Sequence, residues 1–379
     1  MNIQHCHNFA DFRRLARRRL PAPLFHYIDG GAEDETTRER NTAAFGRVAL
    51  VPDALADLSG LDISTTVLGR RLEMPLFCAP TGMSRLFHPD GERAVAQAAA
   101  RAGTYYSLST LSTHSIETIG ETTAGAKMFQ IYIHKDRSLT TEFIERCRAA
   151  RFDALCLTVD TLVSGNRERD KRTGLTMPPR LGARSLLSFA LHPGWAWNYL
   201  RGEKFELANL STRNPQDLVS VMRYVNEQFD QGVVWRDAER IIAQWGKPFA
   251  IKGIMSVADA RRAVDIGASA IMLSNHGGRQ LDGCAAPFDV LPRIADAVGG
   301  QIEIIVDGGV RRGSHVLKAL ALGANACSTG RGYLFALAAG GQAGVERALD
   351  LFREEIKRNM VLMGCPRLEH LDRDKVMRL

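Results

Sequence analysis

The sequence has no two cysteines close enough to form a C-x-x-C motif, although it contains seven cysteines in 379 residues. Their spacing also fits no common zinc ligand pattern, so neither a redox dithiol nor a metal site is expected. Several cysteines lie inside apolar runs, as Cys78 does in "PLFCAP" and Cys156 in "DALCLTVD". We therefore expect reduced, mostly buried thiols in a protein that faces the cytosol.

Long apolar runs are also absent, which excludes a membrane-spanning helix. The first segment, "HNFADFRRLARRRLP", is rich in arginine, as organelle presequences are. However, it contains Asp11, places Phe9, Phe12 and Leu15 on one face, and continues directly into "LFHYIDGGAEDE". These features favour a folded first helix over a removable leader. We expect no signal peptide and a cytoplasmic location, with peripheral contact to the inner face of the cell membrane left open.

Two further signatures are missing, and each absence excludes a class of partner. No G-x-G-x-x-G follows an early strand, which disfavours a nicotinamide cofactor in a Rossmann fold. No basic stripe is interleaved with aromatic residues, so no nucleic-acid partner is expected. The 49 lysines and arginines outnumber the 42 acidic residues and give a formal net charge of +7. This excess indicates either a generally cationic surface or attraction to anionic substrates or an anionic membrane.

What the sequence does contain, from residue 74 onward, is an alternation of short apolar runs with longer helical stretches such as "GERAVAQAAARAG". Continuous apolar runs are typical of parallel strands that are buried on both faces. Eight of them predict an α/β fold, a (β/α)8 TIM barrel, with a doubly wound open sheet as the alternative. We expect one domain over residues 1–379, with an N-terminal helical extension over 1–73 and the barrel over 74–364. The eight runs are "MPLFCAP", "YYSLST", "KMFQIYI", "DALCLTVD", "PFAIKG", "AIMLSN", "IEIIVDGG" and "ACSTGR".

Residues 161–235 interrupt this alternation after the fourth strand, and an insertion there lies over the active-site face of a barrel. Within it, Ser185–Leu200 reads "SLLSFALHPGWAWNYL", which has no charged residue and two tryptophans. This stretch is too short and too interrupted to span a bilayer. It is interpreted as a lid or a subunit contact, or alternatively as an interfacial membrane patch with Trp and Tyr at headgroup level.

The stretch "SNHGGRQLDG", residues 274–283, places a histidine and an arginine among glycines directly after a buried strand. Such glycines let the backbone approach a flat or phosphorylated group, and a cation beside an imidazole suggests an anion with a proton to lose. In a barrel, polar residues at the carboxyl ends of the strands meet at one mouth. A single histidine after a strand is more often structural. Polar residues at the ends of several consecutive strands, however, are hard to explain by core packing alone. The set is Thr81, Ser109, Gln130, Tyr132, Thr158, Asp160, Lys252, Ser274, His276, Arg279, Asp307, Arg311 and Arg331.

The last two strands are followed by "DGGVRRG" and "STGRG", where barrels commonly bind phosphate. One Gly-Gly turn would be only a tight loop, but two adjacent loops that each carry an arginine favour a phosphate. Ser109, Gln130, Thr158 and Lys252 could serve the polar edge of a flat heteroaromatic ring. A phosphate site beside a polar ring edge predicts flavin mononucleotide (FMN). The residues of the two phosphate loops are Asp307, Gly308, Gly309, Arg311, Gly330 and Arg331.

From about Phe9 to Gly364 the chain resembles the FMN-dependent L-2-hydroxy-acid oxidising family, which includes glycolate oxidase, mandelate dehydrogenase and the respiratory L-lactate dehydrogenase. The motifs that carry the resemblance are "YIDGGAEDE", "APTGM", "FQIY", "LTVD", "IKG", "SNHGGRQLD" and "DGGVRRG". "SNHGGRQLD" is highly specific, and the shorter pieces support it by their order. The pieces "HPGWAWNYL" and "LFHYIDGGAE" look most like the bacterial L-lactate dehydrogenase, whereas "SGNRERD" and "PTG" look equally like mandelate dehydrogenase.

The resemblance implies a role for each matched residue. His276 would be the base, and Asp160 would orient it and stabilise the imidazolium. Arg167 and Arg279 would clamp the substrate carboxylate. The remaining residues fall into two groups. Tyr27 and Tyr132 would hydrogen-bond the substrate, and the cofactor would contact Pro80, Thr81, Gly82, Ser274, Lys252 and the ring and phosphate residues named above.

The expected reaction is oxidation of an L-2-hydroxy acid, with L-lactate to pyruvate as the first choice. Leu111, in "STLST", stands where some glycolate enzymes have tryptophan, which weakens a glycolate assignment. The apolar, Trp-bearing insertion favours a membrane quinone or respiratory cytochrome as electron acceptor over oxygen. The resemblance also implies a homotetramer. A barrel enzyme that acts on a phosphorylated substrate without redox chemistry, and a catalytically dead flavin-binding protein, are the alternatives from other classes.

Overall fold

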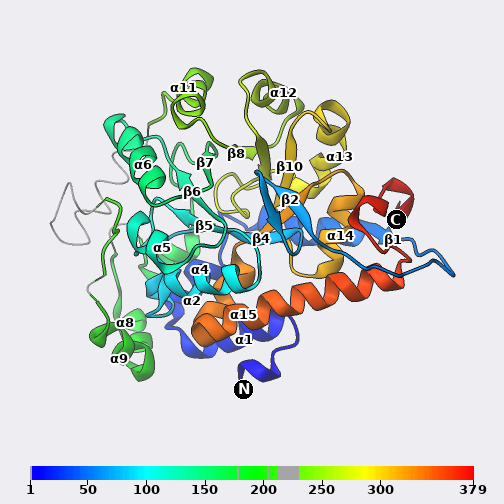
Figure 1. Ribbon diagram of the computed structural model, residues 1–379. Helices are drawn as coiled ribbons and strands as arrows, with labels where there is room; N and C mark the ends of the chain where they lie inside the picture. The colour runs from blue at the N-terminus through cyan, green and yellow to red at the C-terminus, as the bar shows by residue number, and fades with distance from the viewer. Residues whose placement is uncertain (1, 177–178, 204, 211–229) are drawn as a thin grey trace.

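Eight parallel strands close into a barrel, as the sequence predicts (Figure 1). The computed structural model describes residues 2–176, 179–203, 205–210 and 230–379. Along the barrel the strands pair in chain order, and the last strand pairs back with the first. They are β4 (Leu76–Thr81), β5 (Tyr106–Ser109), β6 (Lys127–Ile131), β7 (Ala154–Thr158), β8 (Phe249–Ile254), β9 (Ala270–Ser274), β10 (Glu303–Asp307) and β11 (Ala326–Thr329).

One end of the barrel interior is filled with apolar side chains. Side chains alternate along a strand, so every second residue points inward. Phe77, Tyr105, Met128, Met272 and Ile305 belong to one buried cluster, which includes Val67, Leu68 and Leu72 of the hairpin β2–β3 (Thr65–Val67 and Arg70–Leu72). This packing closes the amino-terminal end of the barrel. A ligand therefore binds at the carboxyl end of the strands.

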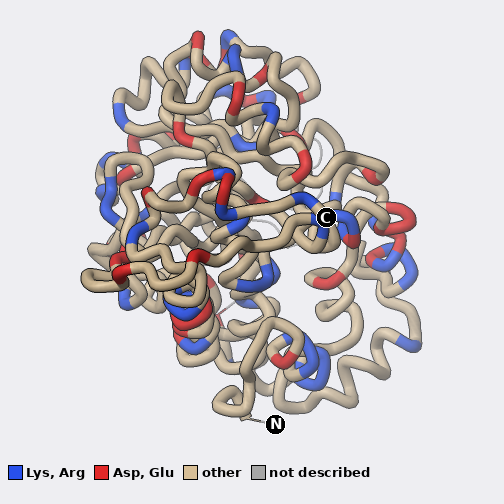
Figure 2. Tube along the Cα trace, turned by 90° about the vertical axis from the view of Figure 1, so that its right-hand side faces the viewer, with Lys and Arg blue, Asp and Glu red and all other residues tan. Residues whose placement is uncertain are grey.

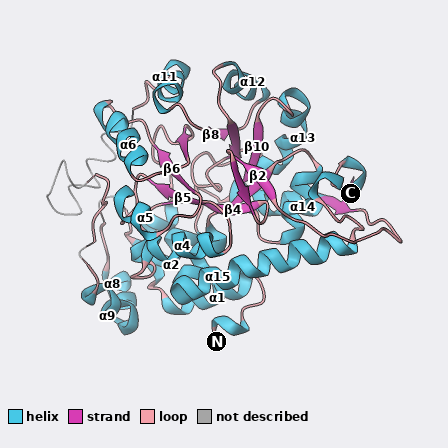
Figure 3. Ribbon diagram, in the orientation of Figure 1, coloured by secondary structure: helices cyan, strands magenta, loops and turns pink. Residues whose placement is uncertain are grey.

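Helices surround the barrel on its outer side (Figure 3). Local sequence explains where they begin. At the start of α12, for example, the Ser256 hydroxyl accepts a hydrogen bond from the Asp259 amide at 3.1 Å, and α13 begins with Pro287. These helices are α4 (Gly91–Arg101), α5 (Ile116–Thr122), α6 (Ser138–Ala149), α11 (Trp235–Trp245), α12 (Val257–Asp265), α13 (Pro287–Val298), α14 (Gly313–Ala321) and α15 (Arg331–Leu362).

The N-terminal extension is helical, as predicted, and lies against the barrel. It contains α1 (Phe9–Arg19), α2 (Ala22–Asp29) and α3 (Thr36–Ala43). In Figure 1, α1 runs beside α15, and the two helices are in contact. Further along, β1 (Val48–Leu50) pairs antiparallel with β12 (Val376–Arg378), so the later part of the extension is tied to the C-terminal segment. The extension is thus built into the fold rather than appended to it.

The insertion after β7, the fourth barrel strand, contributes three described helices. They are α7 (Glu168–Thr173), α8 (Ala183–Ala190) and α9 (Pro193–Arg201). The predicted apolar stretch Ser185–Leu200 falls on α8 and α9, which form a helical hairpin that we call the α8–α9 hairpin. It packs against α2. Residues 211–229 of the insertion lie outside the described residues.

Charge and burial agree with the composition. Figure 2 shows Lys and Arg interspersed with Asp and Glu along the face that carries the C-terminus, rather than gathered in one stripe. All seven cysteines are free thiols, and all but Cys284 are buried. Across the described residues, no helix has both the length and the apolar character that a bilayer crossing requires.

Candidate active site

The polar strand ends meet in one pocket at the carboxyl end of the barrel. Of the residues predicted for the site, all but four line this pocket. The four others, Gln130, Thr158, Asp160 and Ser274, lie at the ends of β6, β7 and β9, and three of them bond directly to lining residues. The lining residues are Tyr27, Pro80, Thr81, Gly82, Ser109, Tyr132, Arg167, Lys252, His276, Arg279, Asp307, Gly308, Gly309, Arg311, Gly330 and Arg331.

His276 and Asp160 form a hydrogen-bonded pair at one side of the pocket. The His276 Nδ1 lies 2.8 Å from Asp160 Oδ1. Burial alone would raise the pKa of Asp160, but the charges of His276 and Lys252 lower it to about 2. Asp160 is therefore a carboxylate at neutral pH and accepts the Nδ1 proton. This leaves Nε2 as the ring nitrogen that can take a proton from a ligand.

A buried network joins Lys252 to the end of β10. Its ammonium donates to Ser274 Oγ at 2.8 Å and lies 3.1 Å from Asp307 and 3.9 Å from Asp160. Asp307 accepts further bonds at 2.7 Å from the hydroxyls of Ser274 and Ser328. Burial lowers the pKa of Lys252, but Asp307 and Asp160 outweigh it, so the net shift is upward. Lys252 is thus a fixed cation at the floor of the pocket.

Several polar groups near this floor are buried without a protein partner among the described residues, and two of them lie on neighbouring strands. They are the Gln130 Nε2 amide and the Thr158 hydroxyl, at the ends of neighbouring strands β6 and β7. The Gln130 Oε1 is engaged, because it accepts a bond from Ser109 Oγ at 3.1 Å. Unpaired buried polar atoms are rare in native proteins, and a bound ligand or water usually satisfies them. Their positions fit the hydrogen-bonding edge of a flavin ring.

Glycines and arginines after β10 and β11 form the far end of the pocket. Gly309 has φ +75°, and a Cβ atom there would lie 2.0 Å from the Asn41 carbonyl oxygen. Only glycine fits this approach, which brings the loop onto α3. Burial lowers the pKa of Arg311 to about 10 and that of Arg331 well below its ordinary range. Buried guanidinium groups of this kind favour an anion as ligand, and the phosphate of FMN fits here.

Arg331 differs in one respect from the prediction that it serves the cofactor alone. Its guanidinium donates to the carbonyls of Ile28 at 2.8 Å, Gly277 at 2.8 Å and Gly30 at 2.7 Å. Three of its five donors are therefore used to hold α2 and the loop of His276 in place. Arg331 joins the phosphate loop to the two segments that carry Tyr27 and the base.

Both arginines predicted to bind a carboxylate lie close to the ring of Tyr27. The Arg279 guanidinium lies 4.7 Å from the Tyr27 ring centroid, and that of Arg167 lies 5.5 Å from it. Burial, with the nearby charge of Arg167, lowers the pKa of Arg279. Two neighbouring guanidinium groups repel one another, and an anion that binds both of them reduces this repulsion. A carboxylate, which can accept hydrogen bonds on two oxygens, is such an anion. The sequence therefore correctly places these side chains together.

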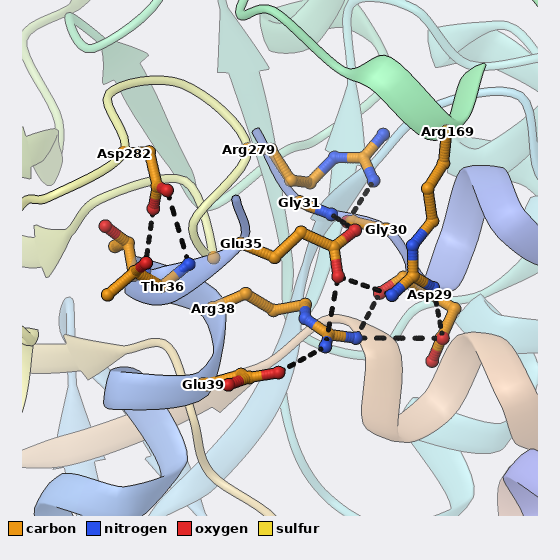
Figure 4. Close-up of polar contacts among 12 residues, drawn as sticks. Asp29, Gly30, Gly31, Glu35, Thr36, Arg38, Glu39, Arg169, Arg279 and Asp282 are labelled. Atoms are coloured by element: carbon orange, nitrogen blue, oxygen red, sulfur yellow. Dashed lines mark hydrogen bonds and ion pairs between the residues drawn. The ribbon is translucent and has the colours of Figure 1, made fainter. Parts of the chain in front are cut away.

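The glycines of "SNHGGRQLDG" serve a contact that the sequence does not reveal. Gly278 has φ +74°, and a Cβ there would lie 2.5 Å from the Arg38 amide nitrogen of α3. The same loop stabilises the start of α3, because the Asp282 carboxylate accepts a hydrogen bond from the Thr37 amide at 2.7 Å. Figure 4 shows Asp282 beside Thr36. The loop of His276 is therefore shaped by its close approach to the N-terminal extension.

Sequence reasoning missed several residues of the site. The Thr161 hydroxyl donates to Asp160 Oδ1 at 3.0 Å and lies 3.3 Å from His276 Nδ1. Ser328, as described, holds Asp307. Both residues follow the pattern of polar strand ends, and Thr161 directly follows a predicted site residue, so this signal was present. The charged cluster around Asp29, Glu35 and Arg169 (Figure 4) has no such signal, because its members come from distant segments.

Comparison with known proteins extends the likeness over almost the whole chain. A sequence profile of the FMN-dependent dehydrogenase family matches residues 16–378. The chain is 42% identical to an L-lactate oxidase of Nostoc sp., with 96% of each protein covered. It is 40% identical to an L-lactate dehydrogenase of Vibrio cholerae, with 97% of this chain and 98% of that protein covered. These relatives match the N-terminal extension and the insertion as well as the barrel.

Among solved structures, the crystal structure of the monotopic membrane protein (S)-mandelate dehydrogenase superimposes with a TM-score of 0.95. The sequence identity is 34%, and the alignment covers 99% of this chain and all of that chain. The fold and the cofactor expected from the sequence are thereby confirmed.

Proposed function

This chain belongs to the FMN-dependent dehydrogenase family and oxidises a 2-hydroxy acid with FMN as cofactor, and from that premise we propose that its substrate is L-lactate and its product pyruvate. One observation carries the proposal. A His–Asp pair stands in the same pocket as Arg167 and Arg279. Arg167 pairs with Asp170 at 3.4 Å, whereas Arg279 has no carboxylate within ion-pair distance among the described residues. A substrate with both a carboxylate and an acidic hydrogen satisfies the two groups together.

In the proposed reaction, Arg167 and Arg279, which both lie near the Tyr27 ring, bind the substrate carboxylate. Tyr27 and Tyr132 then hydrogen-bond the substrate's hydroxyl and carboxylate. Both tyrosines line the pocket, and burial with the charge of Asp160 raises the pKa of Tyr132. Tyr132 is therefore a neutral phenol at working pH, and a phenol hydroxyl can donate or accept a hydrogen bond.

His276 takes the substrate proton at Nε2, and Asp160 stabilises the imidazolium that forms. The oxidation removes two electrons and two protons from the 2-hydroxy acid and leaves a 2-oxo acid. His276 accepts one proton, and FMN, when bound, would accept the two electrons and the other proton. Lys252 would lie beside the ring, where a fixed cation stabilises negative charge, and Gln130, Thr158 and Ser109 would hold the ring edge. Gly308, Gly309, Arg311, Gly330 and Arg331 would hold the phosphate.

The substrate's side chain would face Leu111 and Met83, which line the pocket. An aliphatic wall suits the methyl group of lactate better than it suits glycolate, which has no side chain. L-Mandelate is the second candidate, favoured by the structural likeness to (S)-mandelate dehydrogenase. Lactate carries a methyl group where mandelate carries a phenyl group, and this is the group that the wall would contact. Comparing the two acids as substrates therefore tests both candidates.

We further propose that electrons pass to a membrane quinone or respiratory cytochrome and that the α8–α9 hairpin contacts the membrane from one side. The hairpin exposes Leu187 by 60%, Leu191 by 69%, Trp197 by 55% and Leu200 by 78%. None of its residues lines the substrate pocket, which disfavours a lid in direct contact with substrate. Exposed leucines beside a tryptophan are typical of an interfacial membrane contact, and the mandelate relative is a monotopic membrane protein.

The family likeness also supports a homotetramer, which light scattering of the purified protein would test.

The decisive experiment is the visible spectrum of the purified protein, recorded without oxygen before and after addition of L-lactate. We expect L-lactate to bleach the flavin bands, and D-lactate and glycolate to leave them unchanged. Bleaching by L-mandelate alone would keep the mechanism and replace the substrate. A protein without flavin that cannot be reconstituted with FMN would refute the proposal.

Electron acceptor and membrane contact need separate tests. After substrate bleaching, a soluble quinone should restore the flavin colour quickly and air should restore it slowly; rapid recovery in air would identify an oxidase. Deleting Ser185–Leu200 should abolish co-sedimentation with phospholipid vesicles while bleaching by L-lactate persists. Unaltered sedimentation would instead leave the hairpin as a subunit contact.

A further inference from the structure

A charged cluster outside the pocket contains one arginine more than its carboxylates need. Figure 4 shows Arg169 reaching from α7 toward Asp29 and Glu35 of the N-terminal extension. The Arg169 Nη1 lies 3.0 Å from Asp29 Oδ2, and its Nη2 donates to Glu35 Oε2. The two carboxylates are nearly inaccessible, with side-chain exposures of 4% and 9%, whereas Arg169 is 32% exposed.

Both carboxylates have other partners. Asp29 receives a bidentate bond from Arg13, at 2.6 Å and 2.8 Å. Glu35 lies 3.1 Å from Arg38 and accepts the Gly31 amide at 2.9 Å. Burial raises the pKa of Asp29, but the Arg13 bond and the other arginines outweigh it, and the net shift is downward. Loss of Arg169 would therefore leave no buried carboxylate unpaired, so its role is not merely to neutralise charge.

The position of Arg169 in the chain suggests what it does. It stands in the first turn of α7, and the residue before that helix is Arg167, one half of the carboxylate clamp. Asp29 is the last residue of α2, which carries Tyr27 two positions earlier. A second bond supports the same junction, because the Glu33 amide donates to the Asn166 carbonyl at 2.8 Å. The ion pair thus ties together the two segments whose side chains, Arg167 and Tyr27, face one another at 5.5 Å in the pocket.

We propose that Arg169 is a positioning residue that sets the distance between Arg167 and Tyr27 by bridging Asp29 and Glu35, and thereby sets the affinity for the substrate carboxylate. This inference rests on the proposed function. Arg169 lines no part of the pocket, so it acts through Arg167 rather than on the substrate. Small displacements of a clamp change affinity strongly, because a bidentate carboxylate needs both partners in register.

The test replaces Arg169 by methionine in the FMN-loaded enzyme. Arg169→Met should raise KM for the 2-hydroxy acid by about tenfold and change kcat by less than about twofold, since the base is untouched. Arg169→Lys should recover part of the loss. Arg172→Met is the matched control, because Arg172 lies on the same helix, is 76% exposed and pairs only with Glu168 among the described residues. That control should behave as wild type.

A second readout is independent of turnover. 2-Hydroxyisobutyrate has the carboxylate and the hydroxyl but no α-hydrogen, so its Kd can be measured from the perturbation of the flavin spectrum. Arg169→Met should weaken this binding by the same factor as KM. When Arg167 is already methionine, Arg169→Met should have little further effect, because the two act on one contact.

The outcomes separate the two proposals. If none of the 2-hydroxy acids reduces the flavin of the wild-type protein, the proposed function is refuted. If the wild type is active and Arg169→Met leaves KM and the Kd of 2-hydroxyisobutyrate unchanged, the positioning role is overturned. It is also overturned if the effects of the Arg167 and Arg169 substitutions multiply fully, since that would mean that they act separately.

Discussion

Replacing Asp160 by asparagine keeps the shape of the side chain and removes the charge that faces His276. The structure gives the size of the effect. The pKa of Asp160 falls from 3.8 to about 2, although burial alone would raise it. At about 1.4 kcal/mol per pKa unit, this corresponds to a net stabilisation of the carboxylate by roughly 2.5 kcal/mol, after the cost of burial. His276 at 2.8 Å, Lys252 at 3.9 Å and the Thr161 hydroxyl all contribute to it.

When Asp160 becomes neutral, the imidazolium of His276 loses its contact with this carboxylate. The proton reaches His276 in the transition state of the proposed reaction, and a loss of roughly 2 kcal/mol there slows the step about 30-fold. Because part of the energy comes from Lys252, we expect a decrease between about tenfold and 30-fold. FMN should stay bound, because Lys252 keeps its closer ion pair with Asp307 at 3.1 Å.

The assay is anaerobic stopped-flow absorbance, which follows flavin bleaching by saturating L-lactate from pH 6 to pH 9. Asp153→Asn is a matched control, since Asp153 precedes the same strand at the opposite end of the barrel and accepts the Lys127 amide at 2.9 Å. A bleaching rate for Asp160→Asn within about twofold of wild type, with FMN fully bound, would refute the pairing of His276 and Asp160 as the source of basicity.

Four further outcomes follow from the same geometry. His276→Gln should retain FMN and lose most turnover, as single-turnover bleaching and flavin content would show. Arg279→Met should raise KM by at least about tenfold, because one arm of the clamp is lost, and steady-state kinetics checks this. Gly309→Ala should lose FMN on gel filtration, because its Cβ would lie 2.0 Å from the Asn41 carbonyl oxygen. Finally, because the folded-state pKa of Asp160 is depressed to about 2, its contribution to stability is complete above about pH 4 and disappears as the pH falls toward 2. Asp160→Asn should therefore show a smaller loss of urea stability over that interval than wild type.

The sequence was sufficient for the barrel because its signals are local. Each strand is a short apolar run, and each run ends in a polar residue such as Lys252 or Asp307. In a parallel barrel the carboxyl ends of all strands meet, so residues far apart in the chain could be assigned to one pocket. The structure confirms that they meet. The catalytic and binding roles of the individual side chains stay predictions.

The sequence could not reveal contacts between segments that share no periodicity. The motifs "YIDGGAEDE" and "NRERD" are about 130 residues apart, and nothing in either shows that Asp29 and Arg169 lie 3.0 Å apart. Likewise, the glycines of "SNHGGRQLDG" predicted that the backbone lies close to a ligand. In the structure, Gly278 instead lies against the backbone of Arg38. A glycine in the sequence shows that something approaches the backbone, but only the fold shows what approaches it.

These contacts assign the N-terminal extension to the active site itself. The loop after β10 presses Gly309 onto Asn41, Arg331 donates to the carbonyls of Ile28 and Gly30, and Arg279 donates to Tyr27 O and Gly30 O. The predicted phosphate loop and the proposed substrate clamp thus both contact the extension. Apolar side chains fill the barrel interior below the pocket, so the pocket is confined to the mouth of the barrel. Tyr27 and Ile28 of α2 line the pocket, so the extension supplies part of its wall and is packed against the mouth of the barrel rather than forming a free arm.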